Sequence, residues 1–233
     1  MAEWYESYGI TRPYYADESV CIVNADCRLV LPLIPDKSID LVLTDPPYGI
    51  GSIGGSKPFG SIGGSNIVNV NKYMPIQGDD KPFDPRFLLT IGVNQIIWGA
   101  NYFADKLPSS KGWIVWDKKC KNNWDDNFSD IELAWTSFDR PAKCYRLLYM
   151  GLIQENDREK RVHPTQKPAE LFNWILFNYS QPNEIILDPF LGSGTTAYCA
   201  KKLNRKCIGI EIEERYCEIA AKRCSQSVMK LEV

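Results

Sequence analysis

The chain is poor in the residues that build metal and disulfide sites. It contains a single histidine, His163, and none of its eight cysteines forms a CxxC pair. Because zinc sites draw their Cys and His ligands from short, characteristic spacings, we expect no metal and interpret the cysteines as reduced packing residues. The same lack excludes the zinc deaminases, whose HxE motif is partnered by PCxxC.

Long apolar runs and a large net charge are also missing. No run approaches the roughly 18 apolar residues of a membrane helix, and the opening residues show no basic stretch followed by an apolar one, so we expect a cytoplasmic protein without a membrane partner. The net charge of −2 and the pI of about 5.6 do not indicate a nucleic-acid binder. Three local basic clusters, at 118–121, 140–146 and 201–206, are nevertheless candidates for phosphate contacts.

What the chain does contain is a series of short apolar runs separated by helical patterns. Short apolar runs that alternate with helices favour a largely parallel sheet covered on both faces, in one α/β domain. No helical pattern separates 131–135 from 144–150, so these two are predicted to pair antiparallel at a sheet edge. The predicted strands are 20–24, 39–44, 94–99, 112–116, 131–135, 144–150, 184–188 and 206–212, and the predicted helices are 83–92, 167–179, 194–203 and 213–225.

The stretch LVLTDPPYGIG, at 41–51, ends an apolar strand on two prolines. Pro46 and Pro47 have fixed φ angles and no N–H, and Pro46 keeps Asp45 out of the helical region. The stretch is therefore either a simple strand-ending turn or a rigid set of acceptors for a planar ligand that carries an amino group.

A glycine-rich segment follows directly. Seven of the sixteen glycines fall between 49 and 64, and GSIGGS occurs twice. A patternless stretch as long as 49–80 is either a flexible surface insertion or a functional loop over the site at Tyr48.

A second motif, EIILDPFLGSGTTAYCA at 184–200, combines a strand, a glycine turn and a helix. Gly192 and Gly194 allow a tight turn and close approach of a ligand. The next strand ends at Glu211, whose two carboxylate oxygens can accept hydrogen bonds from both hydroxyls of a ribose. This unit predicts a nucleoside site at the carboxyl ends of the strands.

The glycine turn distinguishes among nucleotides. No GK[ST] closes the turn, so it is not a P-loop. GSGTTA matches GxGxxA of dinucleotide sites, but Asp188 stands before the glycines, where a pyrophosphate is unfavourable and an ammonium group is welcome. S-adenosylmethionine, with a ribose, an adenine, an α-ammonium group and a sulfonium, fits every part.

Together the motifs resemble those of the amino-methyltransferases that modify the exocyclic nitrogen of adenine or cytosine in DNA. DPPY (45–48) is similar to that family's catalytic motif, DPFLGSGTT (188–196) to its cofactor loop, and IEIEERY (210–216) to its ribose acid with the following helix. HPTQKPAELFNWIL (163–176) is similar to the cofactor-flanking helix, and 24–48 to the lead-in that places Asp26 near the cofactor adenine. The order, catalytic motif first, resembles the permuted beta subgroup.

The resemblance implies a Rossmann-like methyltransferase fold with a mostly parallel seven-stranded sheet, an antiparallel edge hairpin and helices on both faces. It implies one catalytic domain over 1–233, with a loop at 49–80 and a small target-recognition region at about 118–161. The implied catalytic residues are Asp45, Pro46, Pro47 and Tyr48. The implied cofactor-binding residues are Asp26, Asp45, His163, Thr165, Gln166, Lys167, Asp188, Pro189, Phe190, Gly192, Ser193, Gly194, Thr195, Thr196 and Glu211.

The implied activity is methyl transfer from S-adenosylmethionine to a base of double-stranded DNA that is flipped into the DPPY pocket. Asp at the first motif position resembles the adenine-modifying members more than the cytosine-N4 ones. A bacterial or phage-encoded enzyme is implied, and the resemblance allows a homodimer and a restriction endonuclease as partners. The alternatives are an RNA or protein-amide methyltransferase, a nicotinamide-dependent dehydrogenase, and a non-catalytic nucleic-acid-binding module.

Overall fold

The structure is a computed structural model that describes residues 3–50, 77–120, 129–150, 153–154 and 166–226. Its main sheet has the strand order β1-β2-β11-β10-β3-β4-β6-β5-β7. Adjacent strands from β2 to β4 pair in parallel, as do β5 and β7, whereas β1 is antiparallel to β2 and β6 is antiparallel to both β4 and β5. Strands β8 and β9 form a separate antiparallel pair.

The elements have the following bounds. The strands are β1 (Tyr15–Ala16), β2 (Val20–Asn24), β3 (Ile39–Thr44), β4 (Gly92–Trp98), β5 (Trp113–Asp117), β6 (Ile131–Thr136), β7 (Lys143–Arg146), β8 (Tyr149–Met150), β9 (Ile153–Gln154), β10 (Ile185–Asp188) and β11 (Lys206–Glu211). The α-helices are α1 (Cys27–Val30), α2 (Ala169–Tyr179), α3 (Thr195–Lys202) and α4 (Glu214–Ser225), and 3-10 turns include η4 (Pro85–Leu88) and η5 (Ala100–Tyr102).

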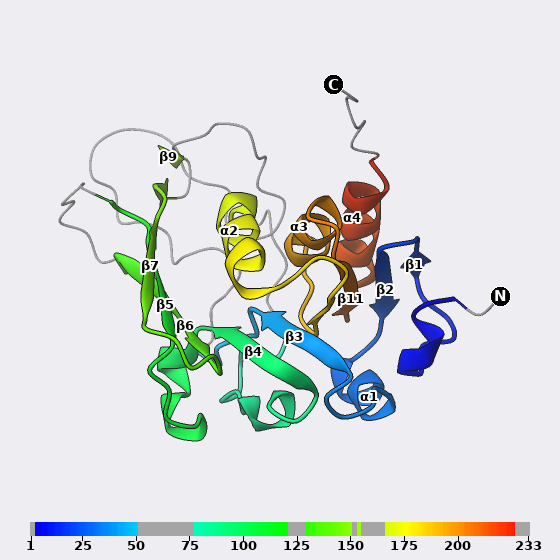
Figure 1. The fold of residues 1–233 in the computed structure, drawn as a ribbon, viewed down its shortest axis with the longest axis horizontal. Helices are drawn as coiled ribbons and strands as arrows, with labels where there is room; N and C mark the ends of the chain where they lie inside the picture. The colour runs from blue at the N-terminus through cyan, green and yellow to red at the C-terminus, as the bar shows by residue number, and fades with distance from the viewer. Residues whose placement is uncertain (1–2, 51–76, 121–128, 151–152, 155–165, 227–233) are drawn as a thin grey trace.

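Two apolar layers hold the sheet between helices. Side chains alternate along each strand, so Val20 and Ile22 pack in the layer shared with α2, α3 and α4, whereas Cys21 and Val23 pack in the layer shared with α1. Figure 1 shows α2, α3 and α4 on one face of the sheet and α1 on the other. The expected mostly parallel sheet with helices on both faces is confirmed.

Three details differ from the expectation. The sheet has nine strands rather than seven, because the short edge strands β1 and β7 extend it. The antiparallel partner of β6 is not the strand at 144–150: β5 inserts between β6 and β7, and 149–150 belongs to the other pair. The predicted helix at 83–92 is wrong, since only the 3-10 turn η4 forms there and Gly92 already pairs with Ile39 in the sheet.

The strand directions bring the two motifs to one edge. β3, β10 and β11 are parallel neighbours, so Asp45, Asp188 and Glu211 lie where these three strands end. In the part of the chain that the structure describes, no helix is both long and apolar enough to cross a membrane. Most of the loop predicted at 49–80, and part of the region at 118–161, lie outside the described residues.

Candidate active site

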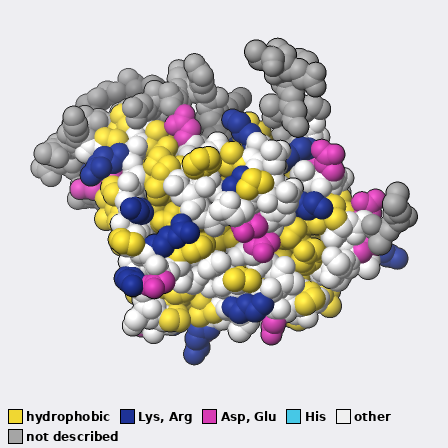
Figure 2. Space-filling view, in the orientation of Figure 1, with side chains coloured by type: hydrophobic (Ala, Val, Ile, Leu, Met, Phe, Trp, Pro, Cys, Tyr) yellow, Lys and Arg dark blue, Asp and Glu magenta, His cyan; other side chains and the backbone are white. Residues whose placement is uncertain are grey.

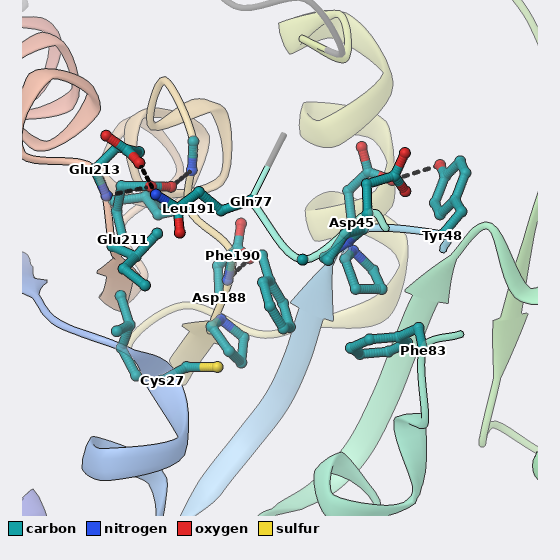
Figure 3. Close-up of a pocket in the computed structure, with 18 of the residues that line it drawn as sticks. Cys27, Asp45, Tyr48, Gln77, Phe83, Asp188, Phe190, Leu191, Glu211 and Glu213 are labelled. Atoms are coloured by element: carbon teal, nitrogen blue, oxygen red, sulfur yellow. Dashed lines mark hydrogen bonds between the residues drawn. The ribbon is translucent and has the colours of Figure 1, made fainter. Parts of the chain in front are cut away.

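A cavity of about 740 Å³ opens at this edge of the sheet. Figure 3 shows Glu211 and Cys27 on one side of it, Asp45 and Tyr48 on the other, and Asp188 and Phe190 between them. Of the residues named from the sequence, those that line the cavity are Asp26, Asp45, Pro46, Pro47, Tyr48, Gln166, Lys167, Asp188, Pro189, Phe190, Gly192, Ser193, Thr195, Thr196 and Glu211. Gly194 lies behind them as the N-cap of α3, and His163 and Thr165 fall outside the described residues.

The DPPY turn presents a carboxylate with both oxygens engaged. Asp45 Oδ1 accepts a hydrogen bond of 2.6 Å from the Tyr48 hydroxyl, and Oδ2 lies 2.5 Å from the ammonium of Lys167. The side chain of Asp45 is 16% exposed, and burial raises its pKa, while the Lys167 charge acts in the opposite direction. The Tyr48 ring stacks on Tyr102, with centroids 5.1 Å apart and planes at 20°.

Gly99 makes room for the Tyr48 ring. A Cβ at this position would lie 2.0 Å from a ring carbon of Tyr48, and Gly99 has a φ of +70° at the start of η5. Glycine is the residue that adopts this conformation without cost. The position of the DPPY tyrosine therefore depends on a glycine 51 residues further along the chain.

We predict that Gly99→Ala displaces the Tyr48 ring from Tyr102 and lowers the free energy of unfolding by roughly 2–4 kcal/mol, from backbone strain and overpacking together. Denaturant unfolding measures this. In a Tyr48→Ala background the same change should cost only the backbone strain, because the ring is gone. An equal cost in both backgrounds would show that the ring and Gly99 do not compete for space.

The glycine turn closes against two helices. Gly194 has a φ of +82°, and a Cβ there would lie 2.7 Å from the Cβ of Ala220 in α4.

Asp188, just before the turn, is buried and accepts hydrogen bonds from the hydroxyls of Thr44 (2.8 Å) and Thr196 (2.5 Å). Burial raises the pKa of Asp188 to about 6, although these hydroxyls favour the carboxylate. Asp188 therefore joins β3 to α3 as well as lining the cavity.

At the other side of the cavity, Glu211 is held by backbone groups. Its oxygens accept hydrogen bonds of 2.8 Å each from the N–H groups of Gly192 and Glu213. Burial raises the pKa of this carboxyl. Asp26 also lines the cavity and caps α1, where it accepts a hydrogen bond from the Arg28 backbone N–H at 2.9 Å. Glu211 at the end of β11 and Asp26 at the start of α1 thus both line this side of the cavity.

Several residues of the cavity and its surroundings were not foreseen from the sequence. Glu132 lies 3.1 Å from Lys167. Phe83 lines the cavity and packs edge-on against Phe190, with centroids 5.6 Å apart. Gln77 donates a hydrogen bond to Glu213, as Figure 3 shows. No local pattern marks them, because each reaches the cavity through contacts with residues distant in the sequence.

Some residues of the basic clusters predicted from the sequence have structural roles. Lys201 pairs with Asp17 at 2.6 Å, and the buried Arg205 donates to Ser180. In the 140–146 cluster, Arg146 lies 3.6 Å from Asp117 but is still 69% exposed at the end of β7. β7 runs parallel to β5, which itself runs in the direction of β3 and β4, so Arg146 lies at the same sheet edge as the cavity. Figure 2 shows Lys and Arg side chains spread over the viewed face without one dominant patch.

The strand order, the helices on both faces and the cavity at the carboxyl edge define a Rossmann-like α/β protein with a ligand site where its parallel strands end. The chain belongs to the DNA methylase family of N6 and N4 methyltransferases, whose profile matches residues 93–222, more than half of the chain. That match includes the glycine turn and Glu211 but begins after the DPPY turn. Members of this family use S-adenosylmethionine.

Individual relatives are similar over nearly the whole chain. The type II methyltransferase M2.LlaDCHI of Lactococcus lactis subsp. cremoris is 28% identical over an alignment of 255 positions. This alignment covers 93% of each chain. The crystal structure of the M1.HpyAVI–SAM complex shares 24% identity and a TM-score of 0.55, covering 88% of this chain and 99% of that one. PvuII DNA methyltransferase (cytosine-N4-specific) shares 16% identity and a TM-score of 0.62, covering 91% and 88%. Both structures support the fold.

Proposed function

We propose that this protein transfers the methyl group of S-adenosylmethionine to the exocyclic amino group of a base in double-stranded DNA, adenine N6 in particular. The observation that carries the proposal is the placement of Asp45 and Glu211 on one cavity of about 740 Å³. One carboxylate suits an amino group and the other suits a ribose, so donor and acceptor substrates would meet between them.

The residues around Glu211 fit the cofactor. Glu211 would accept hydrogen bonds from the ribose hydroxyls, since a carboxylate oxygen offers two acceptor sites and each oxygen here uses one on a backbone N–H. Asp26 and Phe190 would border the adenine, and Asp188 would favour the α-ammonium group. When bound, S-adenosylmethionine supplies an electrophilic methyl group with a neutral thioether as leaving group.

The Asp45 side of the cavity fits the amino group of a base. This nitrogen is nearly non-basic because its lone pair is delocalised, so it must become tetrahedral to react. Acceptors at Asp45 and at the Pro46 carbonyl favour that shape, and the prolines hold them in place before the reaction. The cofactor would supply the methyl group to the nitrogen that Asp45 and the Pro46 carbonyl orient, and the proton that this nitrogen loses would pass to solvent.

Tyr48 and the exposed cations fit a DNA substrate. A base inside a duplex cannot reach the cavity and would have to be flipped out, and Tyr48 offers an aromatic face on which it can stack. Arg146, exposed at the same edge, is suited to a phosphate contact. The relative named M2.LlaDCHI is a type II methyltransferase, which agrees with a DNA substrate. Asp at the first motif position favours adenine over cytosine.

The test is methyl transfer from labelled S-adenosylmethionine to unmethylated duplex DNA, followed by digestion and mass spectrometry of the nucleosides. We expect labelled N6-methyladenosine in its deoxy form. Labelled N4-methylcytosine would keep the reaction and change the base. Parallel reactions with RNA and with protein extract serve as controls, and label in either of these, with none in DNA, would overturn the proposal.

A further inference from the structure

Four alternating charges run from the end of β5 to the DPPY turn. The Lys118 ammonium lies 2.9 Å from Glu132 Oε1, Glu132 Oε2 lies 3.1 Å from the Lys167 ammonium, and Lys167 lies 2.5 Å from Asp45 Oδ2. Glu132 belongs to β6, and Lys167 to the segment that precedes α2. A network of residues far apart in the sequence therefore ends, through Lys167, on one oxygen of the proposed catalytic carboxylate.

The Lys167 ammonium finds its partners within this network. An ammonium group has three N–H donors. Two of them are donated to Asp45 Oδ2 at 2.5 Å and to the Tyr48 hydroxyl at 3.3 Å, and Glu132 Oε2 lies 3.1 Å away as an ion-pair partner. The side chain is 6% exposed, and a buried charge of this kind is retained only where it is paired. Lys167 is thus held on the DPPY side of the cavity by two hydrogen bonds and an ion pair.

We propose that Lys167, held by Glu132, is a positioning residue that fixes the Asp45 carboxylate for the incoming amino group, and is not a ligand of the cofactor. This inference rests on the proposed function. With Oδ2 held by Lys167, Oδ1 is the oxygen that exchanges partners. The Tyr48 hydroxyl occupies Oδ1 in this structure, and the amino group of the base takes its place when the Tyr48 ring turns to stack on that base.

The charge of Lys167 has a second effect, on the ionisation of Asp45. The groups that face Asp45 are Lys167, Glu132 from β6, Tyr48 from its own turn and Asp188 from β10. Burial raises the pKa of Asp45, Glu132 raises it further, and Lys167 lowers it. Lys167 and Lys118 together hold the pKa of Glu132 down to about 2, against the effect of its burial. Only an ionised Asp45 has both oxygens free to accept.

The experiment measures the single-turnover rate of methyl transfer against pH, together with the Kd for S-adenosylmethionine. For Lys167→Met we expect the rate to fall about 10²-fold, as for a misplaced catalytic group. The acidic limb of the profile should move to higher pH, because Asp45 loses the charge that opposes its protonation. The Kd should stay within about threefold of the original value. Lys167→Arg, which keeps the charge, should recover much of the rate and return the limb toward its original position.

Glu132→Gln should shift the limb in the other direction, to lower pH, because it removes the neighbouring negative charge. A purely structural role for either residue would not produce two opposite shifts. Lys111→Met is the matched control: Lys111 pairs with Asp139 at 2.6 Å, but the two side chains are 69% and 83% exposed, so rate and profile should not change. Thermal unfolding checks that each variant folds. If Lys167→Met does not fold, the position of the limb in Glu132→Gln decides the matter, and an unshifted limb there contradicts the inference.

Two results would overturn this inference, and a third would contradict the proposed function instead. If Lys167→Met weakens cofactor binding at least tenfold while the rate at saturation and the acidic limb stay unchanged, Lys167 is a cofactor ligand and the inference is wrong. Unshifted limbs in both Lys167→Met and Glu132→Gln, with full rates, would also overturn it. Absence of methyl transfer to DNA by the unaltered protein would instead contradict the proposed function itself.

Discussion

Asp45→Ala is expected to lower the rate of methyl transfer about 10³-fold, the upper range for loss of one preorganised electrostatic group. The carboxylate is the strongest acceptor that the cavity offers to an amino group, and its Oδ1 already accepts a 2.6 Å hydrogen bond from Tyr48. Without it, the uncharged Pro46 carbonyl is the acceptor left to favour a tetrahedral nitrogen. Rate measurements at saturating cofactor and DNA test this directly.

The affinity for S-adenosylmethionine provides the contrast in the same variant. Glu211 and the glycine turn lie on the far side of the cavity from Asp45, so the Kd should change by less than about tenfold, or roughly 1.4 kcal/mol. Asp45→Asn keeps the shape and removes only the charge, and Asp139→Asn is the exposed control. An Asp45→Ala protein that keeps a tenth or more of the original rate would remove Asp45 from the mechanism.

Glu211→Ala should have the second large effect, and on the opposite property. Two hydrogen bonds from ribose hydroxyls to a buried carboxylate contribute about 1.5–3 kcal/mol each, so their loss should weaken cofactor binding by about 10²-fold or more. The variant also removes the acceptor of the Gly192 and Glu213 N–H groups, so the glycine turn loses two hydrogen bonds that fix its conformation. Calorimetric titration with S-adenosylmethionine measures the affinity.

Acidic pH should act in the same direction as this substitution. Burial raises the pKa of Glu211, so its carboxylate gains a proton at a higher pH than an ordinary glutamate and then has fewer free acceptor sites. Cofactor affinity should therefore fall as the pH is lowered, and Glu211→Ala should remove this dependence. Glu218→Gln, on the exposed side of α4, is the matched control. A Kd that Glu211→Ala leaves within threefold would exclude Glu211 as the ribose ligand.

The sequence alone was sufficient for the elements whose pattern is local. The apolar runs at 20–24 and 39–44 coincide with β2 and β3, and the predicted helices at 167–179, 194–203 and 213–225 contain α2, α3 and α4. Proline and glycine at strand ends marked both halves of the cavity, because their backbone constraints act within one or two residues. The rule that parallel strands end at one edge then brought Asp45, Asp188 and Glu211 together.

Only the tertiary structure decided the position of β6 and what it carries. β6 lies between β4 and β5 and runs against them, so its first residues, Glu132 among them, reach the edge where the parallel strands end. A search for polar residues after strands cannot find a residue at the start of an antiparallel one. Gly99 contacts Tyr48 and Glu132 contacts Lys167, and both contacts join distant parts of the chain. Strand order creates these contacts, and strand order cannot be predicted from the local periodicity of the sequence.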